Sequence, residues 1–86
     1  MSDNNQRRAL VTGGSGDLGG AICRALAATG VHVMVHANGQ LARAEAVRDD
    51  ILAKGGSAQA VAFDVADGDA TRAALAMLLE DGPLQI

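Results

Sequence analysis

Short apolar runs and segments of helical periodicity alternate along the chain, and turn residues separate them. Residues 8–12 (RALVT) form a short apolar run of the kind that is typical of a buried parallel strand. Two further runs, 31–36 (VHVMVH) and 58–65 (AQAVAFDV), predict a second and a third strand. A helical pattern follows each run, so we expect parallel strands joined by helical crossovers.

The predicted helices have recognisable ends. The first runs from about residue 18 to 29 and stops at Gly30, and the second begins at residue 41 and ends at a Gly-Gly pair. The third is expected to start after Asp67 as its N-cap and to close at residues 81–83. The side chains expected on the helix faces that pack are Leu18, Ile22, Cys23 and Leu26, then Leu41, Ala44, Val47, Ile51 and Leu52, then Leu75, Leu78 and Leu79.

Residues 84–86 (LQI) add the start of a fourth strand. The predicted fold class is therefore α/β: the N-terminal half of a doubly wound parallel sheet, β-α-β-α-β-α plus that strand. A chain of 86 residues makes one small domain at most. We expect residues 1–7 to be a flexible polar lead and residues 8–86 to be the folded part.

Five glycines (Gly13, Gly14, Gly16, Gly19 and Gly20) stand around the start of the first predicted helix, where glycine costs about 1 kcal/mol relative to alanine in a helical position. A helix N-terminus leaves backbone N–H groups unpaired and carries about half a positive charge. A turn without Cβ atoms lets a phosphate reach those groups. Gly14, Gly16 and Gly19 fit the dinucleotide spacing G-x-G-x-x-G in its expected strand-to-helix context, so residues 8–86 are predicted to be a partial dinucleotide-binding domain. The residues expected to contact the diphosphate are Gly13, Gly14, Ser15, Gly16, Asp17, Leu18 and Gly19.

Charge and composition exclude several other classes of partner. The formal net charge is −3 and Lys54 is the one lysine, which argues against a nucleic-acid or anionic-membrane surface. No apolar run approaches the roughly 18 residues of a membrane span, and the polar opening does not look like a signal peptide. A single cysteine suits a reducing compartment, so the expected location is the cytoplasm.

Three segments together resemble the N-terminal third of the short-chain dehydrogenase/reductase family, a family with the Rossmann fold. They are VTGGSGDLGGAICRALAATGVHVMV, AEAVRDDILAKGGSAQAVAFDVAD and GPLQI, and they are most similar to the 3-oxoacyl-carrier-protein reductases of fatty acid biosynthesis. The resemblance implies a nicotinamide dinucleotide as cofactor, a carbonyl substrate and a homo-oligomer for the full-length protein.

Asp17 departs from the pattern of the compact family members, T-G-x-x-x-G-x-G, which has glycine at that position. The same segment also fits T-G-x-x-G-x-x-G, the arrangement of the longer, sugar-nucleotide-modifying branch. The segment AKGGSAQAVAFDVAD favours the compact branch. Asp17 itself is interpreted chiefly as an acid that the dipole favours at a helix start.

The choice between NADP(H) and NAD(H) rests on the segment after the second strand, VHANGQ (35–40). It contains no Asp or Glu to accept from a ribose 2′-hydroxyl or to repel a 2′-phosphate, which favours NADP(H) over NAD(H). Many NADP-preferring relatives have a basic residue where this chain has Gly16. Asn38 is expected to contact the ribose or its phosphate, with His36 and Arg43 within reach.

The resemblance also assigns the adenine contacts. It implies that Asp64 accepts from the adenine amino group and that the backbone at Val65 meets the ring nitrogen. The alternative for Asp64 is a role in capping the following helix, which Asp67 is better placed to fill.

No catalytic residue is assigned within these 86 residues. The family transfers hydride with a Tyr and a Lys four residues later, and this chain has no tyrosine. We therefore expect either a fragment or a truncated product, with the first strand left as an apolar edge prone to aggregation. Two alternatives to a reductase stay open: an inert NAD(P)-binding or regulatory module, and an NAD-dependent epimerase-like enzyme of the sugar-nucleotide branch.

Several reactive residue types are interpreted as structural. Cys23 is expected to be buried in the helix face, and His32 and His36 lack a third ligand, so no metal site is predicted. The adjacent Asp49 and Asp50 point about 100° apart on a helix, which does not suit paired acid–base chemistry. A hydrolase is not supported, because the serines lack a histidine–carboxylate arrangement.

Overall fold

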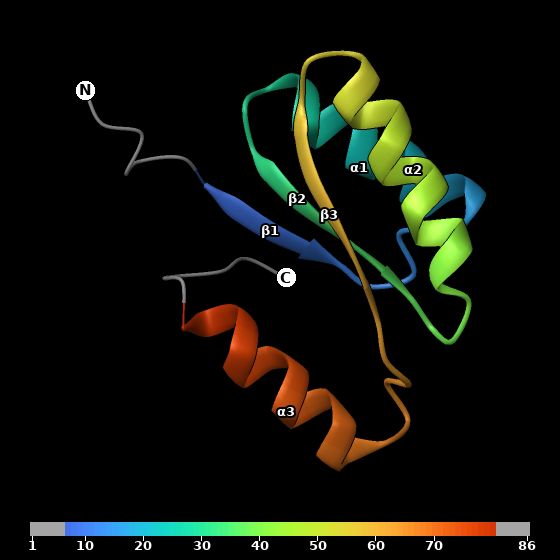
Figure 1. Ribbon diagram of the computed structural model, residues 1–86, viewed down its shortest axis with the longest axis vertical. Helices are drawn as coiled ribbons and strands as arrows, with labels where there is room; N and C mark the ends of the chain where they lie inside the picture. The colour runs from blue at the N-terminus through green and yellow to red at the C-terminus, as the bar shows by residue number, and fades with distance from the viewer. Residues whose placement is uncertain (1–6, 81–86) are drawn as a thin grey trace.

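The computed structural model describes residues 7–80. Strands and helices alternate in the predicted order (Figure 1), which confirms the β-α-β-α-β-α prediction. The elements are β1 (Arg8–Val11), α1 (Asp17–Ala28), β2 (His32–Ala37), α2 (Leu41–Ala53), β3 (Ser57–Ala62) and α3 (Gly68–Leu79). The predicted fourth strand at residues 84–86, the closing turn at 81–83 and all but the last residue of the 1–7 lead lie outside the described residues.

The three strands form one parallel sheet in the order β1-β2-β3. Leu10 is in register with Met34, and Val35 with Ala60. Helices α1 and α2 cover one face of the sheet and α3 covers the other (Figure 1). The architecture is therefore the N-terminal half of a doubly wound sheet, and the carboxyl ends of all three strands meet at one edge.

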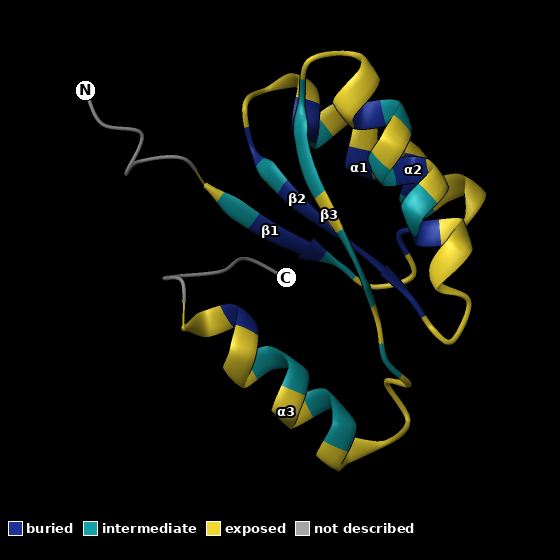
Figure 2. Cartoon of the chain, viewed as in Figure 1, coloured by how far each residue is buried: buried dark blue, intermediate teal, exposed yellow. Residues whose placement is uncertain are grey.

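Strand β2 is the centre of the core because both faces of the sheet are covered there. Every residue from Val33 to Ala37 is buried, and Figure 2 shows this strand dark blue along most of its length. The larger cluster lies between the sheet and helices α1 and α2, and consists of Ala9, Cys23, Ala27, Val31, Val33, Val35, Ala37, Ala44, Val47 and Ile51. Because both faces of the strand are buried, its sequence is largely a continuous apolar run and does not alternate between apolar and polar residues.

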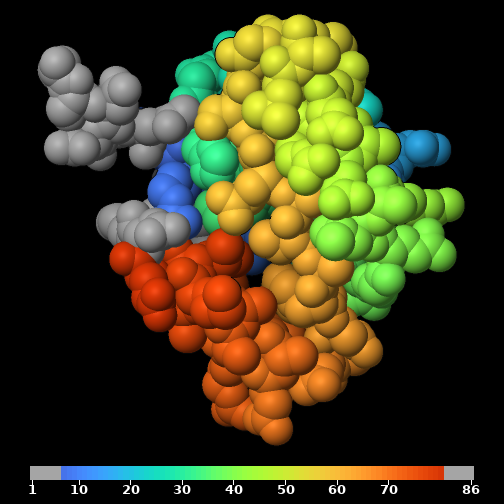
Figure 3. Space-filling view, in the orientation of Figure 1, coloured from blue at the N-terminus to red at the C-terminus, as the bar shows by residue number. Residues whose placement is uncertain are grey.

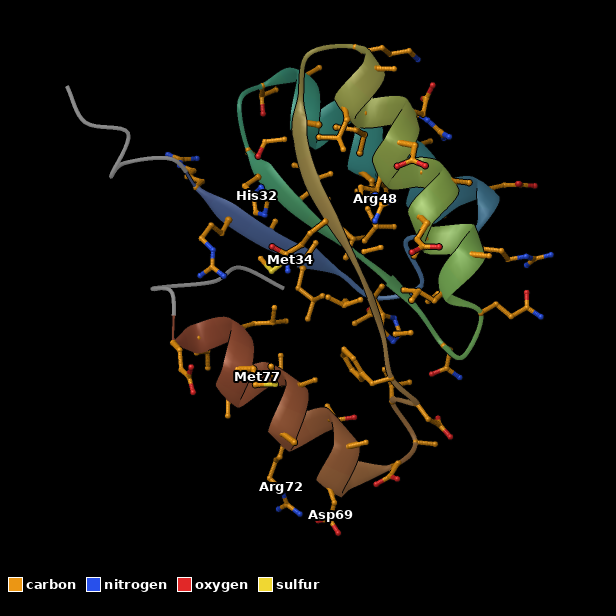
Figure 4. All side chains as sticks on the ribbon, in the orientation of Figure 1. His32, Met34, Arg48, Asp69, Arg72 and Met77 are labelled. Atoms are coloured by element: carbon orange, nitrogen blue, oxygen red, sulfur yellow. The ribbon has the colours of Figure 1, made fainter. Side chains whose placement is uncertain are left out.

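A smaller cluster holds α3 on the opposite face. Leu10, Met34 and Leu78 form it, and Figure 4 shows Met34 between the sheet and this helix. In the space-filling view α3 lies along one side of the molecule, beside the end of β3 (Figure 3). The helix is anchored at both ends. The Asp67 carboxylate accepts from the amides of Asp69 and Ala70, which confirms the predicted N-cap, and Arg8 donates to the Leu78 carbonyl at 2.8 Å.

The prediction of the packing face of α1 is wrong in part. Cys23 is fully buried as expected, but Leu18 is 77 % exposed and Ile22 is 44 % exposed. The buried stripe consists of Gly20, Cys23 and Ala27. Small residues let the helix backbone approach the sheet closely, and because they contribute little to an apolar pattern, the larger side chains beside them misled the prediction.

Similar corrections apply elsewhere. Leu41, Leu52 and Leu79 are exposed, although the Ala44, Val47, Ile51 stripe of α2 and Leu78 of α3 are buried as predicted. Strand β3 ends at Ala62, three residues before the predicted end. The chain turns there because the Asp64 side chain and carbonyl accept from the amides of Ala66 and Asp67.

Candidate functional site

The glycine-rich turn leads from β1 into α1 at the carboxyl edge of the sheet. Gly13 has a φ of +69°, the left-handed region that glycine adopts without strain. The Gly14 amide donates to the Val11 carbonyl at 3.1 Å, and the Gly16 amide donates to the Gly13 carbonyl at 3.2 Å. The chain thereby folds back tightly, and α1 begins one residue after Gly16.

Gly19 is the position where helix and turn come closest. A Cβ atom there would collide with the carbonyl oxygen of Gly13 and would lie 2.9 Å from the Cα of Gly14. These neighbours are backbone atoms, which cannot move aside as a flexible side chain can. Any residue other than glycine would therefore displace the turn from the helix start.

The turn divides its amides between protein acceptors and open positions. Internal acceptors take the amides of Gly13, Gly14 and Gly16, and the Gly20 amide donates to the Gly16 carbonyl at 2.7 Å. Within residues 7–80, the amides of Ser15, Asp17, Leu18 and Gly19 have no acceptor. Gly16, the N-cap of α1, has no side chain to fill that role. Unpaired amides at the start of a 12-residue helix form a site with affinity for an anion such as phosphate.

Asp17 occupies the first helical position of α1 and is exposed. The helix dipole favours a carboxylate at this position, which agrees with the interpretation of Asp17 from the sequence. It also places a negative charge beside the open amides, which opposes a bound diphosphate. Of the residues predicted to contact the diphosphate, Asp17 is the one whose side chain does not favour that ligand.

A cleft of about 370 Å³ opens between the glycine turn and the end of β2. Its lining residues are Gly13, Ser15, Gly16, Ala37, Asn38, Gln40 and Arg43. No acidic side chain lines it, and Arg43 contributes a guanidinium for which residues 7–80 provide no partner. The cleft therefore suits a group that carries a negative charge.

Asn38 connects two loops at the rim of this cleft. Its side-chain oxygen accepts from the Val65 amide at 2.9 Å, while its NH₂ group has no acceptor in the described part of the chain. The structure therefore brings together two residues that the sequence placed in one site from separate strand ends. The Val65 amide is already engaged by Asn38, so an adenine ring would have to share it.

Asp64 follows β3 and is exposed. One carboxylate oxygen accepts from the Ala66 amide at 2.9 Å, and the other has no partner within residues 7–80. Asp64 does not cap α3, because Asp67 does so. One carboxylate oxygen of Asp64 is therefore open to a further donor.

His36 is not available to a ligand, so the prediction that it lies within reach of the ribose is wrong. The side chain is 1 % exposed and both ring nitrogens have partners. Nδ1 contacts the Gly13 amide at 3.0 Å and Nε2 contacts the Phe63 carbonyl at 2.7 Å. No sequence signal indicated that a residue of this strand holds the glycine turn.

Cys23 lies beneath the turn and is fully buried, as expected. Burial raises the pKa of its thiol, which keeps the sulfur protonated and unreactive. A second cavity of about 210 Å³ lies at the C-terminal ends of α1 and α2, away from the turn, and Arg24 and Lys54 line it. Residues 7–80 hold no group of three His, Cys, Asp or Glu side chains that is arranged for a metal ion. None of the described helices has the length and apolar character that crossing a bilayer requires.

A glycine turn with open amides and a cleft at the carboxyl edge of a doubly wound sheet are typical of nucleotide-binding α/β proteins. Comparison with known proteins specifies the family. The family model described as short chain dehydrogenase matches residues 7–83. The chain belongs to this family, which confirms the resemblance.

Two curated relatives are similar over most of the chain. An uncharacterized oxidoreductase of Bacillus subtilis, YjdA, is 40 % identical over 73 residues, which are 81 % of this chain and 29 % of that protein. A 3-oxoacyl-[acyl-carrier-protein] reductase of Synechocystis is 48 % identical over 61 residues, which are 71 % of this chain and 25 % of that protein. The chain therefore spans less than a third of the length of these relatives.

Solved structures show the same relationship. A metagenomic short-chain oxidoreductase in complex with NADP superposes with a TM-score of 0.82 at 35 % identity. The superposition covers 86 % of this chain and 33 % of that one. The described fold is thus that of the N-terminal part of a short-chain oxidoreductase.

Proposed function

We propose that residues 8–86 form the cofactor-binding part of an NADP(H)-dependent carbonyl reductase whose substrate is a 3-oxo thioester or a related ketone. The observation that carries the proposal is the set of open amides at Ser15, Asp17, Leu18 and Gly19 beside an acid-free cleft. A nicotinamide dinucleotide fits this arrangement, because its diphosphate needs amide donors and its adenosine ribose needs the adjoining space. Similarity to a 3-oxoacyl-[acyl-carrier-protein] reductase supports the substrate class.

The glycine turn holds the diphosphate in this proposal. The residues assigned to it are Gly13, Gly14, Ser15, Gly16, Asp17, Leu18 and Gly19. The backbone of Gly13, Gly14 and Gly16 shapes the turn through internal hydrogen bonds, and the open amides donate to phosphate oxygens. Leu18 contributes through its amide, since its side chain is exposed and touches no core residue cluster.

The cleft provides the preference for a 2′-phosphate. The Asn38 NH₂ group and the Arg43 guanidinium are donors without partners in residues 7–80, and both residues line the cleft. A phosphate accepts from such donors, whereas a neutral 2′-hydroxyl gains little from a guanidinium. We therefore assign NADP(H) rather than NAD(H) as the preferred cofactor.

The loop after β3 completes the nucleotide site. The open oxygen of Asp64 accepts from the adenine amino group, and the Val65 amide is shared between the ring and Asn38. NADPH supplies the hydride when it is bound, and the residues described here hold its nucleotide part. The complete protein is proposed to be a homo-oligomer, as the resemblance implies, and to act in the cytoplasm, which the single cysteine favours.

Titration of the complete protein with NADPH and NADH, followed by cofactor fluorescence, tests the assignment. We expect tighter binding of NADPH, and Arg43→Gln is expected to weaken it about tenfold while leaving NADH binding unchanged. The matched control is Arg72→Gln, since Arg72 pairs with Asp69 on the outer side of α3 (Figure 4). Tighter binding of NADH, or equal loss in both arginine variants, would overturn the assignment.

A turnover assay distinguishes a reductase from an inert binding module. Oxidation of NADPH by the complete protein in the presence of a 3-oxoacyl thioester is the expected result. Cofactor binding without turnover of any ketone would favour the inert module instead.

A further inference from the structure

His36 is the one buried polar or charged side chain among residues 7–80. It lies in the central strand β2, yet neither of its ring nitrogens bonds to its own strand. Nδ1 lies 3.0 Å from the Gly13 amide, 23 positions earlier, and Nε2 lies 2.7 Å from the Phe63 carbonyl, 27 positions later. The Phe63 ring packs against the imidazole at a centroid distance of 4.3 Å.

The partners determine the tautomer of the ring. A backbone amide only donates, so Nδ1 must be the unprotonated acceptor, and a carbonyl oxygen only accepts, so Nε2 must carry the hydrogen. The imidazole is therefore neutral and fully satisfied in a site without water access. A buried group with both partners fixed is rigid, because loss of either bond leaves a buried polar atom unpaired.

The two partners belong to opposite ends of the proposed cofactor site. Gly13 is the left-handed residue of the turn, and its carbonyl both accepts from the Gly16 amide and forms the surface against which Gly19 packs. Phe63 directly precedes Asp64, the residue proposed to contact the adenine. One imidazole thus connects the backbone that holds the diphosphate with the loop that holds the base.

We propose that His36 is a positioning residue of the cofactor site, which fixes the glycine turn through the Gly13 amide; this inference rests on the proposed function. His36 does not touch the cofactor. Its bond to Gly13 restrains the one residue of the turn that has positive φ, and thereby the direction in which the open amides point. Loss of this bond frees the turn to sample orientations in which the diphosphate is not held, so affinity falls without any lost ligand contact.

Two conservative variants separate the bonds. In His36→Asn the side-chain oxygen takes approximately the place of Nδ1 and still accepts from Gly13, whereas the contact with Phe63 is lost. In His36→Gln the amide nitrogen reaches approximately the place of Nε2 and still donates to Phe63, whereas Gly13 loses its acceptor. Each variant keeps one of the two bonds. The proposal predicts that only the variant that keeps the bond to Gly13 retains its affinity for the cofactor.

Calorimetric titration of the complete protein with NADP⁺ and with adenosine 2′-monophosphate, which keeps the adenine and the 2′-phosphate but lacks both phosphates of the bridge, tests this prediction. We expect the NADP⁺ dissociation constant to stay within about twofold in His36→Asn and to rise about tenfold in His36→Gln, with that of adenosine 2′-monophosphate changed less than about twofold in both. A role confined to stability would lower the melting temperature in both variants without this split.

Equal weakening of NADP⁺ binding by the two variants, or equal weakening of NADP⁺ and adenosine 2′-monophosphate binding, would overturn the proposal. If His36→Gln does not fold, His36→Asn decides alone: a loss of about tenfold or more in a folded protein contradicts the inference. Wild-type protein that binds neither NADP⁺ nor NAD⁺ would instead overturn the proposed function, and the inference with it.

Discussion

The side-chain oxygen of Asn38 accepts a 2.9 Å hydrogen bond from the backbone amide of Val65. This bond joins the loop after β2 to the loop after β3 across 27 positions of sequence. Asn38 also lines the cleft, together with Arg43. A single side chain therefore joins the two loops at the rim of the cleft.

Asn38→Asp is expected to reverse the cofactor preference. One carboxylate oxygen keeps the bond to the Val65 amide, while the other replaces the NH₂ donor with a negative charge that repels a 2′-phosphate and accepts from a 2′-hydroxyl. We expect the ratio of NADPH to NADH dissociation constants to rise at least tenfold, with an unchanged melting temperature. An unchanged ratio would place the ribose elsewhere.

Gly16→Arg is expected to raise the affinity for NADPH. The backbone at Gly16 has φ −80° and ψ 176°, which any residue adopts, and the nearest atom to a Cβ there is the Gly13 carbonyl oxygen at an ordinary 3.6 Å. An arginine therefore fits and adds a second guanidinium to the cleft. We expect about tenfold tighter NADPH binding and little change for NADH by fluorescence titration. Equal gains for both cofactors would contradict a 2′-phosphate in this cleft.

Gly19→Ala is expected to abolish cofactor binding, because the added Cβ collides with the Gly13 carbonyl and moves the turn away from the helix start. Gly68→Ala is the matched control: Gly68 is the first residue of α3 and a Cβ there meets nothing within 4 Å. The control should bind NADPH normally, and calorimetry on both variants checks this. Retention of wild-type affinity by a folded Gly19→Ala protein would contradict the close approach between residue 19 and the Gly13 carbonyl.

Asp50→Asn tests the contact between α1 and α2. The Arg24 guanidinium donates to the Asp50 carboxylate at 2.7 Å and Lys54 donates to it at 3.2 Å, and these bonds lower the pKa of Asp50 below its ordinary value of 3.8. A lowered pKa means that the stabilisation is present above the unfolded-state pKa and is lost as the pH falls through the folded-state pKa.

The Asp50→Asn protein should therefore melt slightly earlier than wild type at neutral pH, and the difference should vanish in acid. The effect is small because water reaches all three side chains, of which Asp50 is partly exposed and Arg24 and Lys54 are exposed. Thermal unfolding over a pH series measures it, with Asp69→Asn as a control, since Asp69 pairs only within α3. A difference in melting temperature that grows as the pH falls would contradict the lowered pKa of Asp50.

Local patterns predicted the order of elements and the glycine turn, because these depend on short-range chemistry. The Asp67 cap is one example, since a single side chain and the next few amides determine it. The exposure of Leu18 was missed because burial depends on how closely α1 approaches the sheet, which Gly20 and Ala27 decide.

Contacts between distant segments were the part that the sequence could not predict. Asn38 and Val65 were each placed near the cofactor, but their mutual hydrogen bond needs the spatial order of β2 and β3. His36 was expected to reach the ribose, whereas its orientation toward α3 directs it to Gly13 and Phe63. A strand that is buried on both faces does not alternate between polar and apolar residues, so its sequence does not reveal which way a given side chain points.

A crystal structure of the complete protein with NADP⁺ would locate the cofactor. We expect the diphosphate to lie within hydrogen-bond distance of the open amides at the start of α1, with the 2′-phosphate beside Asn38 and Arg43. A diphosphate bound away from residues 13–19, or a ribose outside the cleft, would contradict this expectation.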